Sequence, residues 1–258
     1  MLYDVLRKYR SYLEEKYSKE TARTYYIRLC NLFEGQDIFG NGSNLNIEKV
    51  LNNLANIEHK NHFSQCKNAL LHYCEFMNIS LPVDVLNDIK ELENKTRKKY
   101  RKQKPVDFNL LDKKIKHIQN RKLKLSFQAM LATGLRVAEV AGVKPSDCVI
   151  SDNEIIFSII AKGGDSESVT IQKSEYPKLY QNMKELIEKT LSNKKVFYSA
   201  VYLQSQAKEL DFSCHDLRRC FAKIEYKKRK SKEEVMKKLR HSSLKNTNIY
   251  LKSKIKIE

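Results

Sequence analysis

The sequence predicts a mainly helical protein of two domains, with a small antiparallel β-meander in the second domain. Apolar residues recur three and four positions apart over most of the chain, which is the period of an amphipathic helix. Residues 147–173 instead carry short apolar runs with the period of two that strands show. A basic run at 95–104 separates the two regions. We therefore expect a helical domain at 1–94, a linker at 95–106 and a mixed α/β domain at 107–258.

The first region contains five segments with the helical period. Ser18 is the expected N-cap of the second helix. A loop that holds three of the chain's seven glycines interrupts the pattern after that helix. The predicted helices cover residues 2–17, 19–33, 46–57, 63–77 and 83–93. Their exposed faces are expected to carry Lys8, Arg10, Arg23, Arg28, Lys60 and Lys67.

The basic run K-T-R-K-K-Y-R-K-Q-K holds seven basic side chains in ten residues and is followed by Pro105. Such a run repels itself and cannot form a packed core, so we interpret it as an interdomain linker. Laid along a phosphate backbone it would release counterions, and binding would then depend steeply on salt. The expected DNA-binding residues of the linker are Lys95, Arg97, Lys98, Lys99, Arg101, Lys102 and Lys104.

The second region begins with helical segments that end near Gly134, and a new helix is expected to begin at Arg136. The β-meander follows, with Gly163 and Gly164 in a hairpin turn and Lys162 at its tip. Further helices are expected after it. The predicted helices of this region cover residues 108–120, 123–131, 175–191, 199–209, 215–229 and 231–239.

Charge points to a polyanionic partner. The chain has 49 Lys and Arg against 31 Asp and Glu, a formal net charge of +18. An excess of this size favours DNA or RNA as the partner. The six cysteines show neither a C-x-x-C motif nor the spacing of zinc ligands, and we interpret them as buried thiols of a reducing compartment. No signal peptide or membrane span is evident, so the expected location is the cytoplasm and no membrane partner is expected.

Four candidate reactive residues, two histidines, an arginine and a tyrosine, occur in the C-terminal part of the chain. His215 and Arg218 stand at i and i+3, so on a helix they project from one face. His241 follows a leucine and an arginine, and Tyr250 comes nine residues after it. An arginine that binds an anionic oxygen, histidines that move or share protons and a nucleophilic tyrosine suit phosphodiester chemistry. Cys214 beside His215 does not suggest a cysteine hydrolase, because neighbours in sequence do not aim their side chains at each other.

The C-H-D-L-R-R segment, L-R-H and T-N-I-Y resemble the C-terminal signature of the tyrosine recombinase (phage integrase) family. Upstream, A-T-G-L-R-V-A-E-V around Arg136 resembles the family's first box, and A-K-G-G-D-S resembles its β-hairpin with Lys162. Four boxes in the right order are far more specific than any one of them. The resemblance implies a SAM-like core-binding domain followed by the family's mixed α/β catalytic domain. The chain looks like the minimal two-domain Xer or Cre type, without an arm-binding domain.

The resemblance implies a site-specific DNA recombinase that works through a covalent 3′-phosphotyrosyl intermediate and a Holliday junction. Arg136 and Arg218 would clamp the phosphate, since guanidinium forks match its oxygens and stay charged. Tyr250 would attack, and a phenol leaves readily enough for DNA to be rejoined without ATP. Glu139 would orient a neighbouring cation. The expected proton-handling residues are Lys162 as general acid, His215 for the tyrosine proton and His241 at a phosphate oxygen.

The expected partners are duplex DNA and three further copies of this chain in a synaptic tetramer. No cofactor is expected, and no carboxylate cluster suggests Mg²⁺. Arg240 departs from the family's Leu-Gly-His motif and would be strained if that position needs φ > 0. Asp165 and Glu167 stand where basic residues are common and would weaken DNA contact. Two alternatives stay open: a type IB topoisomerase-like enzyme, and a catalytically silent DNA-binding protein.

Overall fold

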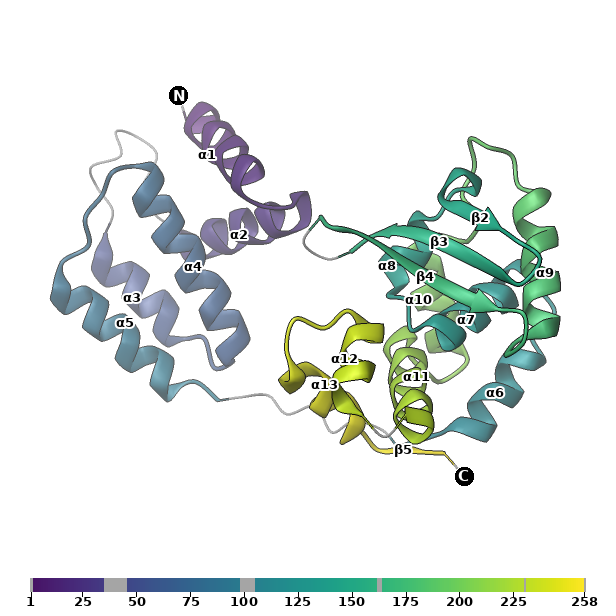
Figure 1. Cartoon of the computed structure of the whole chain (residues 1–258). Helices are drawn as coiled ribbons and strands as arrows, with labels where there is room; N and C mark the ends of the chain where they lie inside the picture. Colours follow the sequence, from purple (N-terminus) through teal and green to yellow (C-terminus); the bar gives the residue numbers. More distant parts are fainter. Residues whose placement is uncertain (1, 35–45, 98–104, 162–163, 230, 258) are drawn as a thin grey trace. The chain divides into compact units, whose positions relative to one another are not determined.

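The structure is a computed structural model that describes residues 2–34, 46–97, 105–161, 164–229 and 231–257. The chain divides into two compact units, Met1–Arg101 and Lys102–Glu258 (Figure 1). Each unit has a hydrophobic core of its own. Lys162, at the tip of the predicted hairpin, lies outside the described residues. The same is true of five predicted linker contacts: Lys98, Lys99, Arg101, Lys102 and Lys104.

The described part of the first unit consists of helices and short connecting segments, with an isolated β-bridge between His59 and Arg97. Ser18 caps the second helix, because its hydroxyl accepts a hydrogen bond from the backbone N–H of Thr21 at 3.4 Å. Asn46 caps the third in the same way, with Lys49 N–H as the donor at 3.0 Å. The buried side chains of Leu29, Phe63 and other apolar residues form the core. The helices are α1 (Leu2–Lys16), α2 (Lys19–Leu32), α3 (Ile47–Ala55), α4 (Lys60–Phe76) and α5 (Val83–Lys95).

The backbone beyond α5 stays attached to this unit for two residues. Arg97 N–H donates to the carbonyl of Glu58 at 2.9 Å, and Arg97 accepts from the N–H of Lys60 at 3.2 Å. The predicted contact residue Lys95 ends α5 and lies 4.0 Å from Glu91 in an exposed ion pair. The first part of the predicted linker is therefore ordered against the helical unit.

A three-stranded antiparallel sheet forms one side of the second unit, as the change of period predicted. Its strands are β2 (Cys148–Ile150), β3 (Glu154–Ile160) and β4 (Ser166–Gln172), in the order β2-β3-β4. Ile159 pairs with Glu167 near the turn of the β3–β4 hairpin. Alternate strand residues such as Ile155, Phe157 and Ile171 are buried in the main core.

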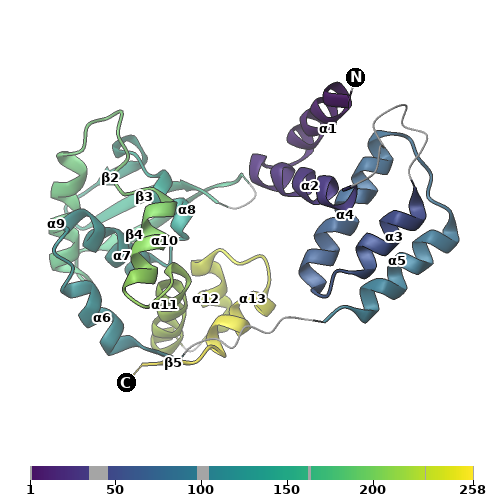
Figure 2. The same ribbon diagram turned by 180° about the vertical axis from the view of Figure 1, so that it is seen from behind.

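Helices cover this sheet and extend the core (Figures 1 and 2). α7 contacts both β4 and α11, so it is the central helix of the unit. Asn120 caps its start, and Gly134 ends it in the left-handed conformation at φ 66°. The helices before the last cluster are α6 (Phe108–Lys116), α7 (Arg121–Thr133), α8 (Val137–Gly142), α9 (Pro177–Glu188) and α10 (Ala200–Glu209).

The last three helices pack against one another around a separate small core. They are α11 (Cys214–Arg229), α12 (Lys232–Leu239) and α13 (Leu244–Leu251). Phe221, Val235 and Leu239 are buried at its centre, and the Tyr250 ring packs against them. This packing fixes the helix that carries Tyr250 to the helix that carries His215 and Arg218.

The C-terminal segment pairs with the start of its own unit, which the sequence pattern did not predict. β5 (Ile255–Lys256) lies parallel to β1 (Val106–Asp107), and Ile255 is buried. Lys223 Nζ on α11 donates to the carbonyl of Ile255 at 2.9 Å. Strands of two residues carry too little apolar pattern to be recognised from sequence.

All six cysteines are free thiols, four of them buried. Burial raises the pKa of Cys214 to about 11, so this thiol is protonated near neutral pH and is not a nucleophile. Across the described part of the chain, no helix combines the length and apolar character that a membrane span needs.

Candidate active site

The tight corner between α7 and α8 positions the first arginine. Gly134 adopts φ 66°, and a Cβ atom at this position would collide with the ring of Phe221. Leu135 is fully buried, and its N–H donates to Thr133 Oγ1 at 3.3 Å. Arg136 then stands as the N-cap of α8 with its side chain 27% exposed. The chain therefore turns sharply here and points Arg136 outward from a rigid base.

Glu139 holds Arg136 through two bonds. One carboxylate oxygen accepts the N–H of Arg136 at 2.7 Å, and the other accepts Nη1 at 2.6 Å. Burial would raise the pKa of Glu139, but the N–H of Arg136 and the charge of Arg240 together hold it below its ordinary value. The carboxylate is therefore ionised, and it contacts the guanidinium groups of Arg136 and Arg240.

The second arginine, Arg218, comes from α11 and is 1% exposed. Ser213 and Asp216 exchange hydrogen bonds at the start of this helix, with Ser213 N–H donating to Asp216 Oδ2 at 2.8 Å. Nη1 of Arg218 donates to the carbonyl of Gly134, and Nη2 donates to the carbonyl of Leu239. Burial and the nearby charge of Arg136 lower the pKa of Arg218 to about 10, so it remains charged at neutral pH.

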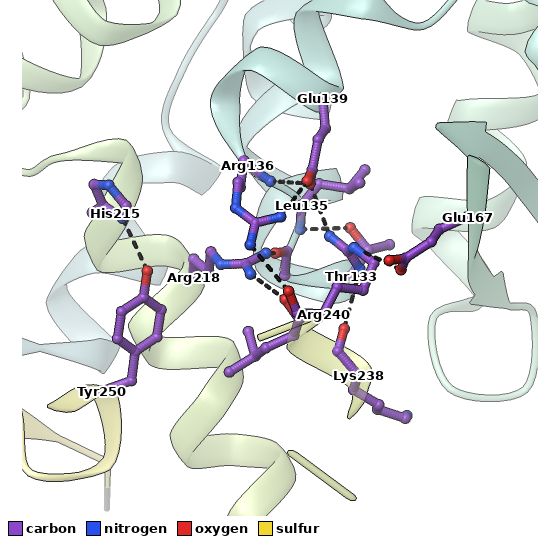
Figure 3. Close-up of polar contacts among 12 residues, drawn as sticks. Thr133, Leu135, Arg136, Glu139, Glu167, His215, Arg218, Lys238, Arg240 and Tyr250 are labelled. Atoms are coloured by element: carbon purple, nitrogen blue, oxygen red, sulfur yellow. Dashed lines mark hydrogen bonds and ion pairs between the residues drawn. The ribbon is translucent and has the colours of Figure 1, made fainter. Parts of the chain in front are cut away.

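Two consecutive carbonyls at the end of α12 contact the two arginines. Leu239 accepts from Arg218, and the carbonyl of Arg240 accepts from Nη2 of Arg136 at 3.2 Å. Figure 3 shows both guanidinium groups converging on this turn. The carbonyl end of a helix carries partial negative charge, so it can hold cations in place when no phosphate is bound.

Tyr250 lies beside the histidine of α11. Its hydroxyl oxygen is 3.2 Å from Nδ1 of His215, on the side of the site where Arg218 and Arg136 lie (Figure 3). The Tyr250 ring also packs edge-on against His241, with ring centroids 4.8 Å apart. The phenol is thus within hydrogen-bond reach of a proton acceptor.

His241 is held by α13. Its Nδ1 lies 3.0 Å from Oγ1 of Thr247, which is fully buried. Burial and the charges of Arg218 and Arg136 lower the pKa of His241 to about 4. Burial and the charges of Arg219 and Arg218 also lower the pKa of His215. Both imidazoles are therefore neutral near pH 7, the form in which His215 can accept a proton.

The structure brings together most of the predicted site. Five of the six predicted catalytic residues converge, and Glu139 supports them; the sixth, Lys162, is outside the described residues. Lys95 and Arg97 belong to the other unit. The converging residues are Arg136, His215, Arg218, His241 and Tyr250.

Sequence reasoning missed several supporting groups. The Arg240 side chain is 5% exposed and pairs with Glu139 at 2.8 Å and with Glu167 at 3.6 Å. Arg240 does adopt a left-handed conformation, at φ 53°, as its place in the motif suggested. The carbonyls at the end of α12 and the role of Thr247 have no sequence signal beyond the boxes themselves. Among the described residues, no group of three or more His, Cys, Asp or Glu side chains is placed to hold a metal ion.

The arrangement combines two guanidinium groups, a phenol and two neutral imidazoles. Comparison with protein families shows that residues 107–256 match the phage integrase family. The chain belongs to this family. The match covers more than half of the chain, and it confirms the resemblance that the sequence motifs indicated.

Solved structures of phage integrase family proteins share the fold. A lambda integrase dimer bound to a core site matches at a TM-score of 0.69 and 15% identity, covering 100% of this chain and 99% of that one. The Tn1549 transposon integrase in complex with transposon right end DNA matches at a TM-score of 0.67 and 13% identity. The match covers 96% of this chain and 95% of that one. The XerH site-specific recombinase bound to its palindromic difH substrate matches at a TM-score of 0.62 and 18% identity. The match covers 90% of this chain and 76% of that one. Comparison with curated proteins found no sequence match.

These likenesses confirm the predicted fold class, a mainly helical chain with the mixed α/β catalytic fold of the tyrosine recombinases. Family membership assigns the chain to DNA recombination in general terms. The Tyr250 to His215 contact and the paired arginines are properties of this chain itself.

Proposed function

We propose that this protein is a site-specific DNA recombinase that cuts and rejoins DNA through Tyr250. The observation that carries the proposal is the Tyr250 hydroxyl, 3.2 Å from His215 Nδ1 and beside two guanidinium groups. A phenol with a proton acceptor on one side and an oxyanion clamp on the other is equipped to attack a phosphodiester.

In the proposed cleavage step, the Tyr250 oxygen attacks phosphorus and the bond from phosphorus to the 5′ oxygen breaks. His215 takes the phenolic proton, which its neutral state permits. Lys162 gives a proton to the departing 5′ oxygen. The products are a 3′-phosphotyrosyl bond and a free 5′ hydroxyl, and the reverse reaction with a new 5′ hydroxyl rejoins the strand. No bond energy is lost, so the reaction needs no ATP.

The two arginines have different access to the phosphate. Arg136 is 27% exposed and would meet the phosphate first. Arg218 is 1% exposed, and its terminal nitrogens donate to the carbonyls of Gly134 and Leu239. A phosphate oxygen would take the place of the Leu239 carbonyl as an acceptor, so the turn after α12 has to shift slightly when DNA binds. His241 follows in the same turn and would donate to a phosphate oxygen.

The remaining basic side chains would supply affinity for the duplex. We assign a helical DNA-binding domain to residues 1–94, a basic linker to 95–106 and the catalytic domain to 107–258. Linker contacts with phosphates would make binding salt-dependent. Four copies would pair two DNA sites and exchange strands through a Holliday junction. The linker contacts are Lys95, Arg97, Lys98, Lys99, Arg101, Lys102 and Lys104.

The decisive experiment offers the protein a pool of nicked duplexes of randomised sequence and resolves products on a denaturing gel. We expect a covalent protein–DNA adduct on the 3′ end that the cut creates, formed in excess chelator and absent with Tyr250→Phe. Sequencing the trapped strands identifies the preferred site. An adduct on the 5′ end, or an adduct that persists with Tyr250→Phe, would contradict the mechanism.

The same material distinguishes the alternatives. Relaxation of supercoiled plasmid by a monomer, without joining of two sites, would indicate a topoisomerase-like enzyme. Duplex binding without any adduct would indicate a silent DNA-binding protein. Strand exchange between two copies of the selected site is the result expected for a recombinase.

A further inference from the structure

Arg240 occupies a backbone conformation that its side chain makes unfavourable. It ends α12 at φ 53° and ψ 47°, in the left-handed region. Glycine adopts this region freely, while a residue with a Cβ does so only at a cost. The C-cap position itself would therefore be served better by glycine. The arginine side chain must supply something that offsets the strain.

The side chain lies between two carboxylates from different elements. Nη2 contacts Glu139 Oε2 on α8 at 2.8 Å, and Nε lies 3.6 Å from Glu167 Oε2 on β4. Nη1 donates to the carbonyl of Lys238 at 3.1 Å. At 5% exposure, this guanidinium is screened from solvent and is not displayed to DNA. Arg240 is thus an internal connector among α8, α12 and β4 (Figure 3).

Arg240 and Arg136 share one carboxylate. Glu139 Oε1 binds Arg136 Nη1 at 2.6 Å, while Oε2 binds both the Arg136 N–H and Arg240 Nη2. The Arg240 carbonyl also accepts from Arg136 Nη2 at 3.2 Å. Two groups of Arg240, its guanidinium and its carbonyl, therefore determine where Arg136 points. Contacts at two points of the Arg136 guanidinium, Nη1 and Nη2, restrict its orientation as well as its position.

Charge balance gives a second reason. Glu139 and Glu167 both lie within ion-pair distance of the Arg240 guanidinium, at 2.8 and 3.6 Å. The positive charge of Arg240 therefore offsets part of the negative charge of these two acids. Without Arg240, the Glu167 carboxylate would lose this ion pair, and its negative charge would weaken the binding of a nearby anion.

We infer that Arg240 is a positioning residue for the reaction: through Glu139 and Glu167 it orients Arg136 and neutralises the acid of β4, without contacting DNA. This inference rests on the proposed function. It also explains how an acid at position 167 is tolerated in a hairpin that, under the proposed function, would lie near DNA.

The test uses the nicked duplex selected above and compares adduct formation with duplex affinity. Arg240→Gly relieves the backbone strain but removes a partner of buried Glu139, so the melting temperature of each variant is measured first and rates are compared below it. We expect the rate of adduct formation by Arg240→Gly to fall on the order of 10²-fold, as misplaced catalytic groups do, with duplex Kd nearly unchanged. Arg240→Lys keeps the positive charge but loses the planar guanidinium group. Its rate of adduct formation should lie between those of the wild type and Arg240→Gly. Adding Glu167→Gln to Arg240→Gly should restore part of the rate, because it removes the uncompensated carboxylate.

Lys237→Ala is the matched control, since it removes an exposed cation from the same helix. It should leave the rate of adduct formation unchanged. Wild-type rates in Arg240→Gly, or no rescue by Glu167→Gln, would overturn the positioning role. An equal loss of rate and duplex affinity would make Arg240 a DNA contact and would also overturn it. Absence of an adduct from the wild-type protein would instead refute the proposed function, and the role of Arg240 with it.

Discussion

Gly134 affects both the stability of the catalytic unit and the position of Arg218 in the candidate site. Its left-handed φ of 66° ends α7, and its carbonyl accepts a hydrogen bond from Arg218. A Cβ at this position would enter the buried ring of Phe221. Gly134→Ala should therefore disturb the backbone, the small core and the second arginine together.

The magnitude follows from three contributions. The left-handed conformation costs a residue with a Cβ about 1–2 kcal/mol. Overpacking against a buried ring adds about 1–3 kcal/mol. The reduced entropy of the unfolded chain returns about 0.4–1 kcal/mol. We expect a net loss of about 1 to 4.5 kcal/mol in the free energy of unfolding.

The assay is thermal or denaturant unfolding of the full chain, followed by adduct formation on the selected duplex. A loss of this size lowers the melting temperature of the catalytic unit by on the order of 10 °C. Adduct formation below the melting temperature should also fall, because the carbonyl that holds Arg218 is displaced.

Gly142→Ala provides a matched control from the neighbouring helix. No heavy atom lies within 4 Å of a Cβ built there, and Gly142 ends α8 without a positive φ. Alanine at this position should be neutral or stabilise by about 0.5 kcal/mol. Equal stability of Gly134→Ala and Gly142→Ala would refute the reasoning.

Three further predictions concern the end of the chain. The pKa of His241 is lowered to about 4 from 6.5, so the unfolded state binds the extra proton between these values and stability rises with pH across that window. After a discount for solvent screening, the free energy of unfolding should fall by about 1–2 kcal/mol between pH 7 and pH 4. His241→Gln should make this pH dependence less steep. The same pH dependence in the variant and the wild type would contradict the assignment. Thr247→Val should lower the free energy of unfolding by about 1–3 kcal/mol and slow adduct formation, because Nδ1 of His241 loses its hydrogen-bond partner. Thr247→Ser keeps the hydroxyl and should stay close to wild type in both measurements. Ile255→Ala should lower the free energy of unfolding by about 2 kcal/mol, because it removes a buried side chain of β5. Lys256→Ala changes the exposed neighbour in the same strand and should have little effect. Equal effects of the two would contradict the pairing of β5 with β1.

Local patterns were sufficient for much of this molecule. Helix periodicity predicted α2 with its Ser18 cap and α7 with its Gly134 end, because both signals lie within one or two turns of chain. The alternation at 154–172 predicted the β3–β4 hairpin for the same reason. The spacing of His215, Arg218 and Tyr250 identified candidate reactive groups, because the residue type alone defines the functional group of each side chain.

The sequence by itself determined the helical period, the basic charge and the identity of the reactive side chains. Only the tertiary structure decided that carbonyls at the end of α12 hold Arg136 and Arg218, that Arg240 lies between Glu139 and Glu167, and that β5 returns to β1. Each of these contacts joins segments far apart in sequence. Their geometry depends on how whole helices pack, and no local propensity encodes that packing.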